Sequence, residues 1–255
     1  PCTESMVGCH NHPPATSVDK AIQFSCNPYF YYTMGRIVQQ GKKSSIFADS
    51  RIGIEIWADY MRSFGLGHKF DIDLQVQSAG LIPDSSYYNK MYPPEQGLWA
   101  YSTIYSNSIG QGEVEVTPLQ MANLAAILAN RGYYITPHLI KSINGGEIPQ
   151  KYIQKNWTKV DTSWFPIAVE GMRKVVQEPG GTARRARTKD IVVCGKTGTA
   201  QNPFGEDHSI FMAFAPMDNP KIAIAVYIEN AGFGGTWAAP IASLMIEKYV
   251  KGFIT

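Results

Sequence analysis

The stretch IVVCGKTGTAQ, residues 191–201, opens with a short apolar run that is typical of a buried β-strand. Two further runs of the same type follow at Ser209–Ala215 and Lys221–Glu229. The connections are short, so the sequence predicts three antiparallel neighbours in one sheet, with the first strand over Ile191–Cys194. Isoleucine and valine alternate with alanine and tyrosine in the last run, which indicates that both faces of the sheet are covered.

Helix signals surround this sheet. One helix is expected over residues 164–176, and another, over about 237–250, would cover one face of the sheet. Earlier helices are expected from Thr16 or Ser17 to Gln23, from Pro28 to Gly41, from Ile52 to Phe64, and from the capping box Thr117–Gln120 to Gly132. The sequence therefore predicts an α+β fold, with an antiparallel sheet flanked by helices and a large helical lobe. We expect a single domain over 1–255, mainly helical over about 1–145 and carrying the sheet with its packing helices over about 146–255.

The amino-acid composition indicates which broad class of protein the chain belongs to. The chain has 255 residues, of which 44% are hydrophobic and 17% charged, as in a folded protein with a sizeable core. The formal net charge is +2, and the cluster Arg184, Arg185 and Arg187 is interpreted as a solvated loop, so no nucleic-acid partner is expected. No apolar run approaches the ~18 residues that cross a bilayer, and we expect the chain itself to be soluble.

The motif Lys196-Thr197-Gly198-Thr199 suits acyl transfer on a substrate that ends in a carboxylate. Lys196 supplies a positive charge, and the two threonine hydroxyls can donate hydrogen bonds to the carboxylate. Gly198 leaves room for a substrate backbone, and the N–H of Thr199 can serve as an oxyanion donor.

A second motif, Ser25-Cys26-Asn27, lies on the expected break between two helices. There Ser25 can pass a proton to a leaving group, and the Asn27 amide can hydrogen-bond a substrate. In this order the two motifs resemble the signature of penicillin-binding proteins and class A β-lactamases, which combines Ser-x-x-Lys, a Ser-x-Asn element and Lys-Thr-Gly.

Longer blocks extend the resemblance to class B penicillin-binding proteins, most closely to the elongation-type penicillin-binding protein 2 group. The blocks are SCNPYFY (25–31), IGQGEVEVTPLQMANLAAILANRG (109–132), PGGTA (179–183), KTGTAQ (196–201), DHSIFMAFAP (207–216) and PKIAIAVYIENAGFGG (220–235). They cover nearly the whole chain, and they imply the penicillin-binding transpeptidase fold, which is similar to that of β-lactamases.

The resemblance implies a serine-type D,D-transpeptidase at the periplasmic face of the inner membrane. Such an enzyme acylates itself with a peptidoglycan stem peptide ending in D-Ala-D-Ala, releases the last D-Ala, and passes the acyl group to the amine of a neighbouring stem. β-Lactams mimic the D-Ala-D-Ala terminus. For the parent protein, the resemblance also implies a membrane anchor and cell-wall elongation proteins as partners, with no cofactor for catalysis.

The resemblance also implies roles for single residues. The positions that match catalytic ones are Ser25, Asn27 and Lys196. The positions that match substrate-binding ones are Thr197, Gly198 and Thr199, with weaker roles for Gln201, Asp207 and His208. For His208 a structural role at the sheet edge remains an equal alternative.

One family motif is not found where it is expected. The family nucleophile lies in a Ser-x-x-Lys well before Ser-x-Asn, whereas this chain begins 24 residues before Ser25. The Ser-x-x-Lys at Ser17–Lys20 is separated from Ser25 by about 12 Å if the eight residues are helical, far beyond hydrogen-bond reach. We therefore interpret Ser17 as a helix cap and Lys20 as solvated. We expect an N-terminally truncated domain that neither transpeptidates nor forms a covalent adduct with penicillin.

A possible structural zinc site lies near the N-terminus. Cys2, Cys9, His12 and Cys26 offer up to four zinc-type ligands, and zinc at Cys26 would brace the Ser-x-Asn turn. His10 is a further candidate ligand. A Cys2–Cys9 disulfide and buried thiols remain alternatives.

Two other classes of function stay open. One is a non-catalytic binding or scaffold module of the cell-wall assembly machinery. The other is a β-lactam sensor or β-lactamase relative, although the sequence shows no acidic or lysine-based deacylation device. The glycines at 232–235 lack the spacing of a phosphate loop and are interpreted as a strand-to-helix connection.

Overall fold

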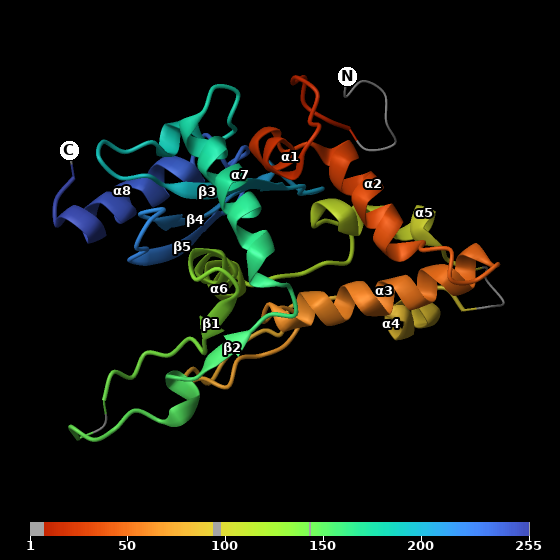
Figure 1. Cartoon of the computed structure of the whole chain (residues 1–255), viewed down its shortest axis with the longest axis horizontal. Helices are drawn as coiled ribbons and strands as arrows, with labels where there is room; N and C mark the ends of the chain where they lie inside the picture. Colours follow the sequence, from red (N-terminus) through yellow and green to blue (C-terminus); the bar gives the residue numbers. More distant parts are fainter. Residues whose placement is uncertain (1–7, 94–97, 143, 255) are drawn as a thin grey trace.

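The computed structural model describes residues 8–93, 98–142 and 144–254 (Figure 1). The α-helices in this part of the chain are α1 (Val18–Phe24), α2 (Asn27–Val38), α3 (Ile46–Ser63), α4 (Ser85–Met91), α5 (Tyr101–Ile104), α6 (Pro118–Ala129), α7 (Phe165–Gln177) and α8 (Ala238–Lys251). The strands are β1 (Tyr133–Ile135), β2 (Lys155–Trp157), β3 (Cys194–Ala200), β4 (His208–Ala215) and β5 (Ile222–Ile228). Two short 3-10 turns also matter for the site, η1 (Tyr105–Ile109) and η4 (Arg184–Ala186).

The central sheet has the strand order β3-β4-β5, with both pairings antiparallel. The prediction of the first strand over Ile191–Cys194 was wrong, because β3 begins at Cys194 and contains the Lys-Thr-Gly-Thr motif itself. Ile191 and Val193 are buried before the strand begins, so their apolar pattern reflects burial rather than strand pairing. β3 lies at one edge of the sheet, and its free edge presents the motif.

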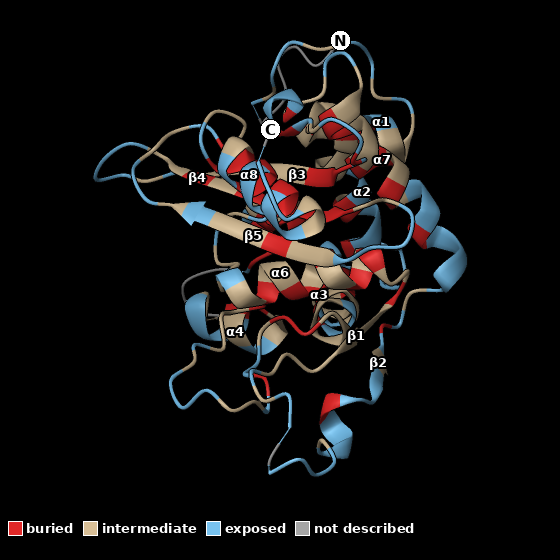
Figure 2. Cartoon of the chain, turned by 90° about the vertical axis from the view of Figure 1, so that its left-hand side faces the viewer, coloured by how far each residue is buried: buried red, intermediate tan, exposed pale blue. Residues whose placement is uncertain are grey.

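Helices cover both faces of this sheet, as the alternation in residues 221–229 predicts (Figure 2). On one face, Phe211 and Ala213 of β4 share a core with Ala242 of α8. On the other face, Phe214 shares a core with Met172 of α7. The predicted α+β class with an antiparallel sheet between helices is confirmed.

The helical lobe has a core of its own, which includes the fully buried side chains of Tyr88 and Trp99. Here α2 and α3 cross so closely that a Cβ on Gly53 would lie 2.1 Å from the carbonyl oxygen of Val38. The buried face of α3 therefore carries small residues such as Gly53 and Ala58. The predicted apolar face through Ile52 and Tyr60 was wrong, since Tyr60 is 40% exposed.

Helix ends follow the chemistry of their capping groups. The Thr117 hydroxyl accepts from the N–H of Gln120, whose side chain accepts from the N–H of Thr117, so the predicted capping box of α6 is confirmed. α2 begins with Asn27 and Pro28, close to the predicted start, but it ends at Val38 rather than at Gly41. The chain turns earlier because the buried Asp49 carboxylate accepts the backbone N–H groups of Gly41 and Lys42.

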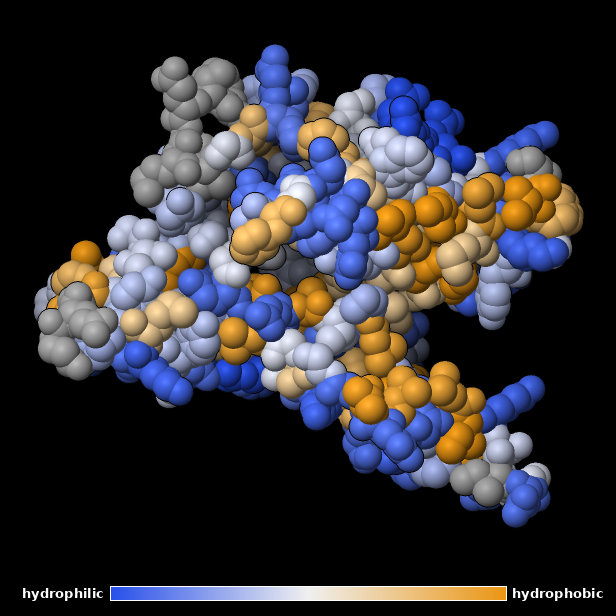
Figure 3. Space-filling view, turned by 180° about the vertical axis from the view of Figure 1, so that it is seen from behind, coloured by the Kyte–Doolittle hydropathy of each residue, from blue (hydrophilic) through white to orange (hydrophobic). Residues whose placement is uncertain are grey.

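Residues 133–142 and 144–157 form an arm that extends from the body of the molecule (Figure 1). The antiparallel pair β1–β2 closes its base, with Tyr133 opposite Trp157, and this short pair was not predicted. Apolar side chains gather on this arm and on the end of the molecule that carries α8 (Figure 3). Among the described residues, no helix has both the length and the apolar character that crossing a membrane requires.

Candidate active site

A cleft of about 890 Å³ lies between the α1–α2 turn and the free edge of β3. Most of the predicted site residues line it, namely Ser25, Asn27, Lys196, Thr197, Gly198, Thr199, Gln201 and Asp207. Segments that are distant in sequence complete the walls. They are the end of η1 with Gln111, the residues before and within η4, and the loop before α8, which contribute Ser108, Ile109, Gln111, Gly181, Thr182, Arg184, Arg185 and Phe233–Thr236. The two motifs therefore share one cleft.

Ser25 ends α1 in the left-handed backbone region, with φ 53° and ψ 50°. The N–H groups of Ser25 and Cys26 donate to the carbonyls of Ile22 and Ala21, which closes the end of the helix. This conformation costs a non-glycine residue about 1 kcal/mol. Strain of this kind concentrates at functional sites, and here it accompanies a side chain that points at β3.

Lys196 joins the two motifs. Its Nζ donates to Ser25 Oγ at 2.8 Å and to the carbonyl oxygen of Thr197 at 2.8 Å. Both acceptors are neutral, and burial lowers the pKa of Lys196 to about 8. A lysine with this pKa carries positive charge at neutral pH yet releases a proton readily, so it can both attract a carboxylate and exchange a proton with Ser25.

The rest of β3 is held by contacts on both sides. Thr197 Oγ1 lies 2.8 Å from Thr182 Oγ1, and the Gln111 side-chain amide donates to the Thr199 carbonyl at 3.4 Å. The loop after β5 lies directly on the strands, because a Cβ on Gly234 would be 2.1 Å from the carbonyl oxygen of Ile210. The glycines at 232–235 connect β5 to α8, as predicted.

Asn27 lines the cleft from the first turn of α2. Its Nδ2 donates to the carbonyl oxygen of Gly8 at 2.6 Å. His10 lines the same cleft, so the segment around residues 8–10 forms part of its wall. This contact could not be predicted from the residue types alone.

Asp207 precedes β4 and His208 begins it, but the two residues have different surroundings. Asp207 Oδ1 accepts the N–H of Asn202 at 3.2 Å, which closes the loop between β3 and β4. His208 is not among the cleft-lining residues described. Its Nδ1 accepts the N–H of Asn230 at 3.1 Å, and its ring packs on Tyr227. These contacts favour the structural role for His208 over the predicted substrate-binding role.

Ser17 and Lys20 lie away from the cleft. Ser17 immediately precedes α1, at the opposite end of the helix from Ser25, and Lys20 is exposed. Ser17 occupies the predicted N-cap position, but its side chain accepts no helix N–H. It hydrogen-bonds Asp19 instead.

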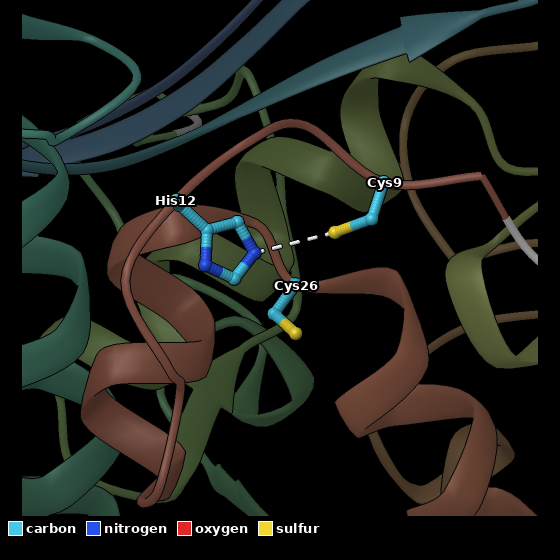
Figure 4. A group of neighbouring side chains, drawn as sticks. All are labelled: Cys9, His12 and Cys26. Atoms are coloured by element: carbon cyan, nitrogen blue, oxygen red, sulfur yellow. Dashed lines mark hydrogen bonds between the residues drawn. The ribbon is translucent and has the colours of Figure 1, made fainter. Parts of the chain in front are cut away.

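Three of the predicted zinc ligands meet beside the α1–α2 turn (Figure 4). The ligand atoms of Cys9, His12 and Cys26 all lie within 4.8 Å of one another. His12 Nδ1 donates to the carbonyl of Pro13, and its Nε2 lies 3.2 Å from Cys9 Sγ, so the lone pair faces the sulfur atoms. Backbone hydrogen bonding of this type orients imidazole ligands in zinc sites. Cys2 lies outside the described residues, and His10 faces the cleft rather than this group.

The sequence matches the profile of a known domain, described as "Penicillin binding protein transpeptidase domain", over residues 3–247. The chain belongs to the penicillin-binding protein transpeptidase family. It is similar to the peptidoglycan D,D-transpeptidase MrdA of Haemophilus influenzae, at 35% identity over 92% of this chain and 36% of the relative. It thus spans about a third of the length of the curated relatives it matches.

Solved transpeptidase structures share the fold. Penicillin-binding protein 2 of Pseudomonas aeruginosa, in complex with WCK 5153, has a TM-score of 0.78 and 30% identity over 94% of this chain and 49% of that chain. The penicillin-binding protein 2 of Helicobacter pylori, in complex with MreC, has a TM-score of 0.73 and 26% identity over 92% of this chain and 40% of that chain.

Several cleft residues of this transpeptidase domain were not assigned from sequence. Gln111 and Thr182 lie in the blocks IGQG and PGGTA that carry the family resemblance, which was the available signal. Arg184 and Arg185 were interpreted only as part of a solvated loop. They are exposed, and both line the cleft.

Proposed function

We propose that this chain forms the greater part of the transpeptidase domain of a serine-type peptidoglycan D,D-transpeptidase, which cross-links stem peptides ending in D-Ala-D-Ala and is inhibited by β-lactams. The observation that carries the proposal is the 2.8 Å hydrogen bond from Lys196 Nζ to Ser25 Oγ. It joins a helical turn to an edge strand inside one cleft, as acyl transfer at a single peptide carbonyl requires.

Each motif residue has a place in this chemistry. The hydroxyls of Thr197 and Thr199 bind the terminal carboxylate of the donor stem near Lys196, and the Thr199 N–H stabilises the oxyanion. As the peptide C–N bond breaks and an acyl–oxygen bond forms on the nucleophile, Ser25 gives its proton to the departing D-Ala amine and regains one from Lys196. Lys196 in turn takes up the hydroxyl proton that the nucleophile releases. The amine of the acceptor stem then attacks the acyl carbon, the acyl–oxygen bond breaks, and the amine proton passes through Ser25 and Lys196 back to the oxygen of the nucleophile.

This proposal assigns the role of nucleophile to neither Ser17 nor Ser25. The one Ser-x-x-Lys in the sequence, Ser17–Lys20, does not line the cleft, and Ser25 is required for proton transfer. We infer that the chain alone binds β-lactams and stem peptides reversibly and forms no acyl-enzyme.

Incubation with excess fluorescent penicillin, followed by intact mass measurement, tests this assignment. The chain is expected to keep its mass, and a longer protein that adds a preceding Ser-x-x-Lys is expected to gain one penicillin. An adduct on Ser17 or Ser25 would overturn the account of the nucleophile. Failure of the longer protein to label would contradict the transpeptidase itself, and release of hydrolysed penicillin would favour a β-lactamase relative.

We also propose that Cys9, His12 and Cys26 bind a structural zinc ion, with a fourth ligand from Cys2 or from water. Two thiolates and an oriented imidazole form a donor set that zinc prefers. Cys26 lies between Ser25 and Asn27, so the ion would fix the turn that presents both side chains to the cleft. It would play no part in acyl transfer.

The partners, the location and the membrane anchor of the whole protein are proposed by analogy with relatives. The similar Helicobacter pylori protein forms a complex with MreC, and by analogy we propose cell-wall elongation proteins as partners here. A periplasmic location and a membrane anchor follow from the same proposal, because peptidoglycan stem peptides are cross-linked outside the inner membrane.

A further inference from the structure

The turn η4 places two arginines on a firmly held backbone. Ala183 and Ala186 on either side of Arg184 and Arg185 are fully buried. The Ala183 N–H donates to the carbonyl of Val175 at the end of α7, and both alanines share the core with α8. The buried alanines that flank the two exposed arginines therefore fix the backbone positions from which the guanidinium groups extend.

These arginines belong to the cleft wall. Arg184 and Arg185 line the same cleft as Lys196 and Thr197. The connection is short, because Thr182 Oγ1, two residues before Arg184, lies 2.8 Å from Thr197 Oγ1. A peptide held at β3 therefore passes within the reach of long arginine side chains.

The charge of this pair is not balanced within the described part of the chain. Arg62 and Arg173 form ion pairs with carboxylates, whereas no described ion pair includes Arg184 or Arg185. The one carboxylate among the described lining residues, Asp207, already accepts a backbone N–H from Asn202. With Lys196 included, the cleft has more positive charge than a single terminal carboxylate would neutralise.

We propose that Arg184 and Arg185 form a second anion-binding position, which recognises a carboxylate on the stem peptide other than its C-terminal one. This inference rests on the proposed transpeptidase function and specifies its substrate class as stem peptides with an additional free carboxylate. The planar guanidinium fork matches a carboxylate in geometry and charge. The C-terminal carboxylate is assigned to Thr197, Thr199 and Lys196, so the two anions occupy different parts of the cleft.

Reversible peptide binding to the full chain, measured by isothermal titration calorimetry, tests the assignment. The probes are N-acetylated pentapeptides that end in D-Ala-D-Ala and carry at the third position either a free carboxylate or the matching carboxamide. The carboxylate peptide is expected to bind about three- to tenfold more tightly, as two solvent-accessible charge pairs allow. The double variant Arg184→Gln/Arg185→Gln is expected to lose this preference while its affinity for the carboxamide peptide stays within about twofold.

Arg187→Gln is the matched control, because Arg187 is exposed in the same segment but does not line the cleft. It is expected to keep the preference, and an equal loss in this variant would overturn the proposal in favour of general electrostatic attraction. Equal affinities of the unaltered chain for the two peptides would also overturn it. A peptide ending in L-Ala-L-Ala distinguishes failure of the arginine proposal from failure of the proposed function. Equal binding of the D and L termini would overturn the transpeptidase function as well. Circular dichroism of each variant shows that the fold is retained.

Discussion

Lys196 Nζ donates a hydrogen bond to Ser25 Oγ at 2.8 Å, across 171 residues of sequence. The contact joins an edge strand to a strained helical turn, and neither partner carries a formal negative charge. The lysine therefore keeps a low pKa instead of being locked as a cation by a carboxylate. The stability and the ligand binding of the domain should both depend on this pair.

The lowered pKa of Lys196 predicts a specific pH dependence of stability. Its pKa falls from 10.5 to about 8 on folding, so the unfolded state binds more protons between these two pH values. The unfolding free energy of the unaltered chain should therefore rise with pH in this window relative to Lys196→Met, by about 1–3 kcal/mol. Urea denaturation of both proteins at pH 7, 8, 9 and 10 measures the difference, and a difference that stays constant with pH would contradict the shift.

The left-handed backbone of Ser25 predicts that glycine is tolerated better than alanine at this position. Ser25→Gly and Ser25→Ala both remove the acceptor for Lys196, but only alanine retains the steric strain. We expect Ser25→Gly to be more stable by about 1 kcal/mol in urea denaturation. Ser17 provides the control, since its φ of −148° is extended. At Ser17 glycine should give no gain, and a gain of similar size there would mean that strain at Ser25 is not the cause.

The close approach of the β5–α8 loop predicts unequal effects of alanine at two glycines. A Cβ on Gly234 would meet the carbonyl oxygens of Ile210 and Gly198 at 2.1 and 2.4 Å, and these backbone atoms cannot move independently. A Cβ on Gly198 would meet only the Ile210 side chain, at 3.2 Å. Gly234→Ala should cost about 2–4 kcal/mol and Gly198→Ala about 1 kcal/mol or less in denaturation experiments. Comparable costs would show that the loop adjusts freely.

The proposed zinc ion predicts about one metal atom per chain in protein purified without chelator. Cys9→Ser and Cys26→Ser should each lower the zinc content and the melting temperature, because the ion braces the turn between α1 and α2. His10→Gln is the control, since His10 faces the cleft, and it should retain the metal. Metal-free protein with a mass reduced by two hydrogens would instead establish a disulfide.

Local signals in the sequence were sufficient where the cause of the structure is local. The capping box at Thr117 and the break before Pro28 predicted helix starts correctly, because capping depends on neighbouring residues. The buried face of α3 was missed because the close crossing at Gly53 depends on a partner helix. The start of β3 was missed for a related reason, since burial alone does not distinguish Ile191 from a paired strand residue.

In the candidate site, too, features with a local cause were predicted, and features that depend on distant parts of the chain were missed. The two motifs identified the residues around the Lys196–Ser25 contact, because acyl transfer constrains residue types as well as spacing. Arg184 and Arg185 were missed as cleft residues because charge on a loop has no periodicity that reveals which surface it faces. The contact of Asn27 with Gly8 was missed because a backbone carbonyl acceptor leaves no trace in side-chain identity.

Several hydrogen-bonding groups of the cleft already have partners within the protein. The carbonyls of Thr197 and Thr199 accept from Lys196 and Gln111, and the Asn27 amide donates to Gly8. A peptide that displaces these three contacts only exchanges one hydrogen-bond partner for another, and such an exchange yields little net free energy. Discrimination between ligands then depends on how well each one reproduces the displaced geometry. A tight inhibitor of this cleft would be a rigid molecule that replaces all three internal contacts at once.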